Sequence, residues 1–183
     1  MIRRFGVLLT ALLMVGCLSA CQSKPSQAQV FAMDTLMLFS VYGENGEAAI
    51  QDARQEINRL ENLLSRTREN SEVTCLNRAS GESQPVKVGS ELCDLIEQTR
   101  QFSQATADAF DITLAPISSA WGFTEDAYRV PSQTELDALL THVGMEHVHT
   151  DAEAGMAWLD EGTQIDLGAI AKGYASDRIK EIF

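Results

Sequence analysis

The sequence predicts an α+β fold, a mixed sheet with packed helices, and three segments carry that prediction. Residues 30–43 are apolar and rich in β-prone side chains, and they end in a glycine-containing turn, which is typical of a strand. Residues 50–64 repeat apolar side chains at spacings of three and four, which indicates one face of a helix. Residues 156–159 and 164–167 resemble two short strands around a turn, which is typical of a hairpin. Because strands and helices do not alternate regularly, the pattern favours α+β over a parallel βαβ arrangement.

The elements between these segments follow in chain order. Residues 65–77 are polar and lack periodicity, so we expect a loop there. Ser132, followed three residues later by Glu135, predicts the start of a helix with a capping box, and this helix should end before Gly144. The pattern also predicts a short strand at residues 85–88, a helix around 92–102, an irregular segment at 106–121 and a strand at 147–149.

The last predicted element is a helix that begins at Gly168. Apolar side chains recur at helical spacing as far as Ile182, and no glycine, proline or other stop signal precedes Phe183. We therefore expect this helix to be still running at residue 183 and the chain to be truncated at its C-terminus.

The N-terminus has the pattern of an export signal. Arg3 and Arg4 precede an uncharged apolar run that is shorter than the about 20 residues a membrane-spanning helix needs. Leu18-Ser19-Ala20-Cys21 resembles the bacterial lipobox, in which the cysteine is lipidated, whereas Cys17 fits that pattern less well. Ordinary signal cleavage is the alternative.

We expect three regions: a lipoprotein signal peptide at residues 1–21, a polar tether at 22–29, and a folded domain at 30–183. The protein would then be exported and lipid-anchored to a bacterial membrane, facing the periplasm or the cell exterior.

The charge of the chain limits its ligands. The formal net charge is −12, and it becomes more negative if Arg3 and Arg4 leave with the signal peptide. Such a surface repels nucleic-acid phosphates, so the composition argues against a nucleic-acid partner. A phosphate-bearing ligand would need local positive charge or a metal ion.

Residues 165–175 (IDLGAIAKGYA) are the most informative about chemistry. A predicted strand ends at Asp166, small residues follow, and a helix begins. Small residues allow a ligand to approach the backbone, and the free N–H groups of a helix start attract anions. Lys172, one turn into the helix, supplies a positive charge suited to phosphate. The pattern favours a phosphate-bearing ligand, and a tight turn with a solvated lysine is the alternative.

Other candidate residues are less specific. Phe110, between small and acidic neighbours, would stack on a flat ring or fill the core. His147 and His149 share a strand face, but no third zinc ligand with suitable spacing accompanies them. Cys75 and Cys93 are expected to be buried free thiols rather than a disulfide.

Taken in order, four stretches resemble the ApbE family of FAD:protein FMN transferases. They are Met33-Asp34-Thr35, the polar loop at 65–77, residues 106–113 with Pro116 and Trp121-Gly122-Phe123, and residues 165–177. The last stretch is nearly unbroken, and the resemblance covers residues 30–183. It implies an Mg²⁺-dependent enzyme that transfers FMN from FAD, through a phosphoester bond, to a Thr or Ser of a target protein and releases AMP. The implied partners are flavin-acceptor proteins, such as extracytoplasmic domains of redox complexes.

The resemblance also implies roles for individual residues. Ala169 would give its backbone carbonyl to Mg²⁺. Family members carry the side-chain Mg²⁺ ligands, an Asp and a Thr, beyond this helix, so we expect the 183 residues by themselves to be inactive. The FAD site would be lined by Met33, Ala109, Phe110, Asp111, Asp166 and Lys172.

Three residues depart from the family pattern. Asp34 replaces the Gly of Met-Gly-Thr, Thr67 replaces the Tyr of Ser-x-Tyr-x-x-x-Ser-Glu, and Asp108 replaces the Gly before Ala-Phe-Asp. These changes affect close backbone approach, a flavin-contacting ring and the shape of a loop, respectively. Two other functions stay open: an FAD pyrophosphatase without a protein acceptor, and a non-enzymatic flavin-binding lipoprotein.

Overall fold

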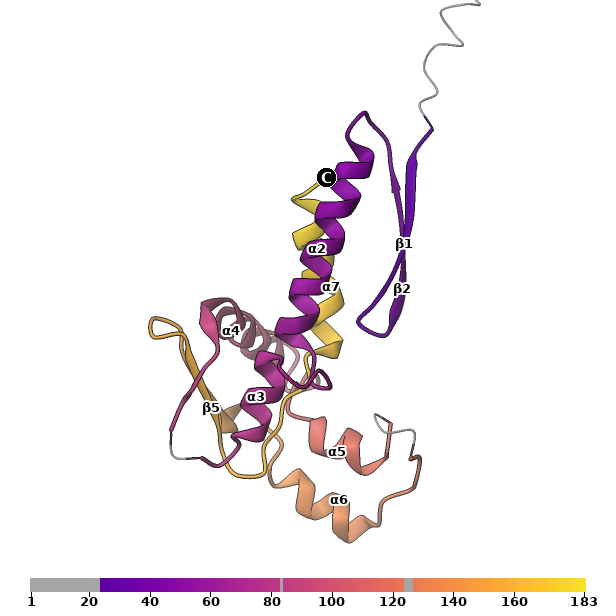
Figure 1. The fold of residues 1–183 in the computed structure, drawn as a ribbon. Coiled ribbons are helices and arrows are strands. Elements are labelled where there is room, and N and C mark those ends of the chain that lie inside the picture. Colours follow the sequence, from indigo (N-terminus) through magenta and orange to yellow (C-terminus); the bar gives the residue numbers. More distant parts are fainter. Residues whose placement is uncertain (1–23, 83, 124–126) are drawn as a thin grey trace, which may run out of the picture.

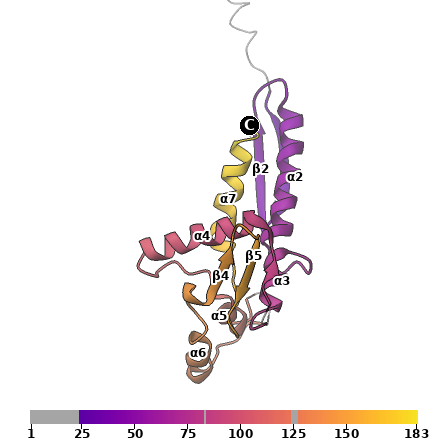
Figure 2. The same ribbon diagram turned by 90° about the vertical axis from the view of Figure 1, so that its left-hand side faces the viewer.

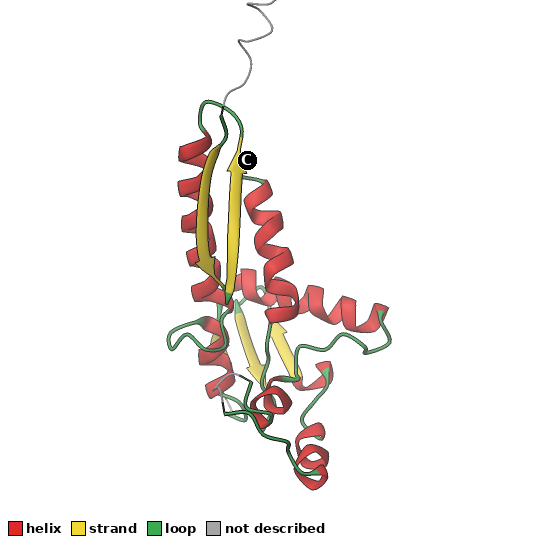
Figure 3. Ribbon diagram, turned by 90° about the vertical axis from the view of Figure 1, so that its right-hand side faces the viewer, coloured by secondary structure: helices red, strands yellow, loops and turns green. Residues whose placement is uncertain are grey.

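A β-hairpin covers two helices that lie side by side (Figures 1 and 3). β1 (Ser26–Ala32) pairs antiparallel with β2 (Thr35–Val41), and both strands contact α2 (Gly46–Leu64), which also contacts α7 (Gly168–Lys180). The computed structural model describes residues 24–82, 84–123 and 127–183. A small core fills this end of the molecule, formed by Ala32, Ala53, Ile57 and Ile179 with Val30, Met37 and Phe39 packed against them.

A second sheet, with the strand order β3-β5-β4, forms the other half of the molecule (Figure 2). It consists of β3 (Val86–Lys87), β5 (Met156–Leu159) and β4 (Val148–Asp151), paired antiparallel, and the 3-10 helix η1 (Met145–His147) leads into β4. α3 (Glu72–Arg78) packs on β5, and α4 (Gly89–Ala105) packs on β4 and β5. α5 (Ala115–Ala120) and α6 (Gln133–Leu140) contact each other at the end opposite the hairpin.

The main hydrophobic core joins the two halves. It contains Leu60 of α2, Leu76 of α3, Leu92 of α4 and Leu159 of β5, all buried, together with Leu167 just before α7. Burial of apolar surface on this scale is the main stabilising contribution to a fold of this kind. The predicted α+β class is confirmed.

The run at residues 30–43 contains parts of two strands rather than the one expected. Met33 and Asp34 have φ of 51° and 53° and join β1 to β2 as a two-residue loop. Two consecutive positive φ angles indicate a type I′ turn, whose twist suits a hairpin. Neither residue is glycine, so composition did not reveal the turn. β1 begins at Ser26, and residues 26–29 therefore belong to the strand and not to the expected tether.

The predicted pairing of residues 164–167 with 156–159 is wrong, since β5 pairs with β4 and β3 instead. Gln164 forms an isolated parallel bridge with Leu114. The Asn77 side chain occupies the place of a strand partner: its Nδ2 donates to the Ile165 carbonyl and its Oδ1 accepts from the Ile165 N–H, both at 2.8 Å. The backbone N–H and carbonyl of Ile165 thus have hydrogen-bond partners although this segment pairs with no neighbouring strand there.

The polar stretch at 65–77 is a loop only as far as Ser71. Its side chain accepts a hydrogen bond from the Thr74 N–H at 3.0 Å and caps α3, so the second part of the predicted loop is helical. A short helix, α5, likewise lies within the segment expected to be irregular. Ser132 accepts from the Glu135 N–H at 3.2 Å, which confirms the predicted start of α6.

α7 ends at Lys180, contrary to the expectation that it would continue to residue 183. The N–H of Ile182 donates to the carbonyl of Ile179 in a final turn. The ring of Phe183 then packs edge-on against Phe39 of β2, with centroids 6.0 Å apart.

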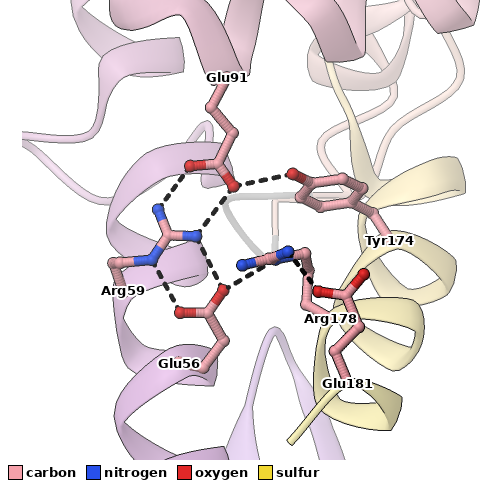
Figure 4. Close-up of polar contacts among 6 residues, drawn as sticks. All are labelled: Glu56, Arg59, Glu91, Tyr174, Arg178 and Glu181. Atoms are coloured by element: carbon pink, nitrogen blue, oxygen red, sulfur yellow. Dashed lines mark hydrogen bonds and ion pairs between the residues drawn. The ribbon is translucent and has the colours of Figure 1, made fainter.

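A charge network fixes α7 against α2 and α4 (Figure 4). The Arg59 guanidinium of α2 donates to Glu56 at 2.8 Å and to Glu91 of α4 at 2.6 Å. On α7, the Tyr174 hydroxyl donates to Glu91 at 2.8 Å and Arg178 donates to Glu56 at 3.3 Å. Hydrogen bonds from Arg59 lower the pKa of both glutamates, and burial raises the pKa of Tyr174 to about 12.

Candidate functional site

A pocket of about 220 Å³ is lined by residues of the β1–β2 turn, the C-terminal end of α2 and the start of α7. These three segments come together near the middle of Figure 1. Three of the residues predicted from the sequence, Met33, Asp166 and Lys172, line the pocket together. The other lining residues are Asp34, Glu61, Leu64, Ser65, Arg66, Thr67, Gly168 and Ala171. The fold therefore assembles the pocket from three segments that are distant in the sequence.

Lys172 is the available positive charge in this pocket. Its side chain is exposed on the second turn of α7, and its ammonium group makes no hydrogen bond or ion pair within the described part of the chain. At the start of α7, the N–H groups of Gly168, Ile170 and Ala171 already donate to Asp166 or Leu167, so the Ala169 N–H is the one left to favour an anion near Lys172. Such a position is suited to a phosphate group, and the phosphate role of Lys172 stays a prediction.

Asp166 is committed to the protein on both carboxylate oxygens. Its Oδ1 accepts from the Gly168 N–H at 2.8 Å, and its Oδ2 lies 2.8 Å from Nε of Arg66. A Cβ added to Gly168 would lie 3.0 Å from Oδ1, so a larger residue would disturb this contact. Asp166 therefore orders the start of α7, which sequence reasoning did not foresee.

Glu61 and Arg66 belong to the pocket but were missed in the sequence. Glu61 accepts from the Met33 N–H at 3.1 Å and also pairs with Arg68, so it holds the hairpin turn against the end of α2. Both residues lie at or beside the boundary between the predicted helix and loop, where side-chain direction cannot be inferred from periodicity. Positive charge in an acidic chain was the available signal for Arg66.

The departures Asp34 and Thr67 both lie in the pocket wall. Asp34 occupies a left-handed backbone position, which explains why the family pattern has glycine there. Thr67 contributes a hydroxyl, 3.1 Å from the Ser65 hydroxyl, at the place where the family pattern has an aromatic ring.

The predicted residues Ala109, Phe110 and Asp111 do not line this pocket. Phe110 packs against the main core and meets Phe102 edge-on at 6.1 Å, while Asp111 accepts hydrogen bonds from the Thr113 N–H and hydroxyl. The loop that holds them adjoins the pocket through the backbone, because the Asp166 N–H donates to the Ile112 carbonyl at 2.7 Å.

Asp108, the third departure, also has a left-handed backbone, with φ of 62°, and it follows Ala107 at 51°. Its Oδ1 accepts from the Ser103 hydroxyl at 3.0 Å. The aspartate thus adopts the conformation that suits glycine and adds one hydrogen bond that glycine would lack. The loop keeps its turn in spite of the substitution.

The described residues do not by themselves fit a magnesium ion. Ala169 is exposed in the first turn of α7 but does not line the pocket. Glu61 and Asp166 are engaged by arginines, and within residues 24–82, 84–123 and 127–183 no group of three or more His, Cys, Asp or Glu could hold a metal. Mg²⁺ requires a near-octahedral set of about six oxygens.

The histidines and cysteines are placed away from the pocket. His147 and His149 both hydrogen-bond to the carboxylate of Asp160, at 3.0 and 2.9 Å. Their hydrogen bonds lower the pKa of Asp160. Cys75 and Cys93 are free thiols, as expected, but Cys75 is exposed and only Cys93 is buried.

The arrangement is suited to binding an anion next to a small, partly apolar cavity. Sites that enclose a whole cofactor-sized ligand measure roughly 300–1,000 Å³, so a pocket of about 220 Å³ fits only part of a dinucleotide. No helix among the described residues is long and apolar enough to cross a bilayer. Cys21 lies outside the described residues.

Known proteins resemble this chain in sequence and in fold. The ApbE family model matches residues 33–183. An FAD:protein FMN transferase of Klebsiella pneumoniae (strain 342) is 31% identical over 81% of this chain and 47% of its own length. One of Treponema pallidum (strain Nichols) is 30% identical over 98% of this chain and 52% of its own.

Solved structures agree with these matches. The ApbE protein of Thermotoga maritima MSB8 has a TM-score of 0.81 at 31% identity, over 87% of this chain and 52% of that one. The flavin transferase ApbE of Vibrio cholerae, H257G mutant, has a TM-score of 0.78 at 22% identity and shows the same fold. The chain spans about half the length of the curated relatives it matches. Since the family model covers residues 33–183, the chain belongs to the ApbE family.

Proposed function

We propose that the protein acts in FAD:protein FMN transfer, moving FMN from FAD to a Thr or Ser hydroxyl of an acceptor protein. The observation that carries the proposal is the pocket in which the Met33 turn, the Arg66–Asp166 pair and the unpaired Lys172 meet at the start of α7. Relatives named FAD:protein FMN transferases support it.

In the proposed reaction, the acceptor oxygen forms a new bond to the FMN phosphorus as the bond from that phosphorus to the bridging oxygen breaks. AMP leaves with the bridging oxygen, and the hydroxyl proton is released to solvent. Phosphoryl transfer depends mainly on positioning and on neutralising charge. Lys172 would neutralise part of the phosphate charge, and the Ala169 N–H at the start of α7 would help to orient the phosphate. The Met33 turn, held by Glu61, would form the wall beside it.

Magnesium dependence is part of this proposal and rests on the family resemblance and on the acidity of the chain. Mg²⁺ would supply neutralisation of the pyrophosphate charge. The described residues do not by themselves provide its coordination shell.

The function is tested by incubating purified protein with FAD, Mg²⁺ and an acceptor domain, and by looking for covalent flavin fluorescence on a denaturing gel. The Klebsiella pneumoniae relative serves as the positive control. Because the chain spans about half the length of its curated relatives, we expect residues 1–183 alone not to label the acceptor and a form that includes the rest of the family domain to label it. Release of FMN and AMP without labelling would favour the pyrophosphatase, and FAD binding without products would favour a flavin-binding lipoprotein.

We also infer export and lipid anchoring at Cys21, supported by the signal pattern at residues 1–21. A lipid anchor would place the domain near extracytoplasmic acceptor domains of membrane redox complexes. Radiolabelled fatty acid should be incorporated into the wild-type protein and lost in Cys21→Ser, with Cys17→Ser as the matched control. Label that persists in Cys21→Ser would exclude this anchor.

A further inference from the structure

Arg66 is a partly buried charged side chain in the pocket wall, and the family pattern assigns it no role. It stands at the unspecified position of Ser-x-Tyr, between Ser65 and Thr67. Its side chain is only 12% exposed although it carries a charge. A buried guanidinium needs partners for its donors, because leaving a charge unsatisfied is costly. Its partners therefore indicate what it does.

Two partners of Arg66 lie on segments distant in the sequence. Its Nε lies 2.8 Å from Oδ2 of Asp166, just before α7, and one terminal nitrogen donates to the Ser119 hydroxyl of α5 at 3.1 Å. The guanidinium thus joins the loop after α2 to α5 and to the start of α7. Its planar fork suits such bridging, which a lysine cannot reproduce.

Asp166 connects Arg66 to the backbone at the start of α7. One of its oxygens receives Arg66, the other receives the Gly168 N–H at 2.8 Å, and its own N–H is fixed to Ile112 at 2.7 Å. The orientation of the Asp166 carboxylate therefore sets the direction of the first turn of α7. Lys172 follows on the next turn of the same helix.

We propose that Arg66 is a positioning residue that, through Asp166, holds the start of α7 in the orientation that binds the phosphate of the ligand. The inference rests on the proposed function for the identity of the ligand. In this arrangement the guanidinium of Arg66 binds protein groups only, and contact with the phosphate is left to Lys172 and the Ala169 N–H. Arg66 and Asp166 then act as one unit, so the effects of removing either should not add.

The test is a double-mutant cycle in ligand binding. Arg66→Ala, Asp166→Asn and the double variant are compared by calorimetry with FAD and AMP, which carry phosphate, and with riboflavin, which does not. Each single variant should weaken FAD and AMP binding about tenfold, and the double variant should bind them no more weakly than the weaker single variant. Riboflavin affinity should stay unchanged, and so should all affinities in the matched control Arg78→Ala.

Additive losses would overturn the inference, because they would show that Arg66 contacts phosphate independently of Asp166. Unchanged AMP affinity in Arg66→Ala, or an equal loss for riboflavin, would also overturn it. Circular dichroism checks that each variant is folded, and Arg66→Gln replaces Arg66→Ala if the latter unfolds. Failure of FMN transfer would remove the proposed function but leave this binding comparison intact.

Discussion

Arg59 should contribute measurably to stability, and the geometry of its network allows the magnitude to be worked out. It makes two hydrogen bonds to Glu56 and two to Glu91, at 2.6–2.8 Å. The glutamate side chains are only 15% and 31% exposed, whereas Arg59 itself is 45% exposed. Arg59→Ala would leave two carboxylates facing each other between α2 and α4.

The expected loss in the free energy of unfolding is about 2 kcal/mol. Hydrogen bonds to charged groups contribute roughly 1.5–3 kcal/mol each when they are shielded from solvent, and exposed ion pairs contribute about 0–1 kcal/mol. The half-exposed guanidinium lies between these limits. Glu56 keeps Arg178 and Glu91 keeps Tyr174 in the variant, which prevents a larger loss.

The effect should also depend on pH with a defined sign. Arg59 lowers the pKa of Glu56 and Glu91, so its contribution is present above their ordinary value of 4.5 and is lost as pH falls through the lowered values. Urea unfolding is followed by circular dichroism at pH 7 and pH 3. The difference in the free energy of unfolding between Arg59→Ala and wild type should be smaller at pH 3 than at pH 7. Arg129→Ala, which breaks an exposed pair with Glu135, is the control and should change little.

A loss below about 0.5 kcal/mol at pH 7 would place Arg59 among ordinary surface pairs and refute the argument. A difference that is the same at pH 7 and pH 3 would refute the assigned role of the two carboxylates.

Three further predictions concern single residues. Lys172→Ala should weaken FAD binding roughly 10- to 100-fold in calorimetry, whereas Lys180→Ala, on the last turn of the same helix, should not; equal losses would contradict the phosphate role. Glu72 has a buried, unbonded Oε2 and a pKa raised by burial, so its stability contribution is greatest below pH 4.5 and falls as pH rises. Glu72→Gln should therefore stabilise the fold against urea at pH 7 and have less effect at pH 4, and the reverse order would contradict this. Asp34→Gly should raise the free energy of unfolding by up to about 1 kcal/mol and Asp34→Ala should lower it, because left-handed backbone costs ordinary residues about 1–2 kcal/mol; a more stable alanine variant would disprove the turn assignment.

The sequence predicted the longer helices α2, α4, α6 and α7, where apolar side chains recur at helical spacing, but it missed the short helices α3 and α5. It placed Met33, Asp166 and Lys172 at a ligand site, and the structure brings these three together. The hairpin turn at Met33 escaped notice because its positive φ angles are imposed on residues that rarely show them. Residues 164–167 alternate between apolar and polar side chains, which is typical of a strand. This alternation indicates which side chains are buried, but it does not show which segment the backbone pairs with.

Arg66 and Glu61 could not have been placed from the sequence for a different reason. Their partners lie on other segments: Asp166 and Ser119 for Arg66, and the Met33 backbone for Glu61. Local pattern carries no information about contacts across such separations. For a loop such as residues 65–71, the sequence therefore shows which residues are charged but not which groups their side chains contact.

The two hydrogen bonds between Asn77 and Ile165 have a kinetic consequence. One side-chain amide joins residues 88 positions apart, so the segment that leads into α7 can be fixed only after α3 has docked. Contacts of such long sequence separation form late in folding, because the intervening loop must close first. The segment at residues 165–168, which contributes Asp166 and Gly168 to the pocket, is therefore expected to be among the last parts to form and among the first to open. Hydrogen exchange at the Ile165 amide reports that opening directly, and a bound ligand that contacts Asp166 or Gly168 would slow it.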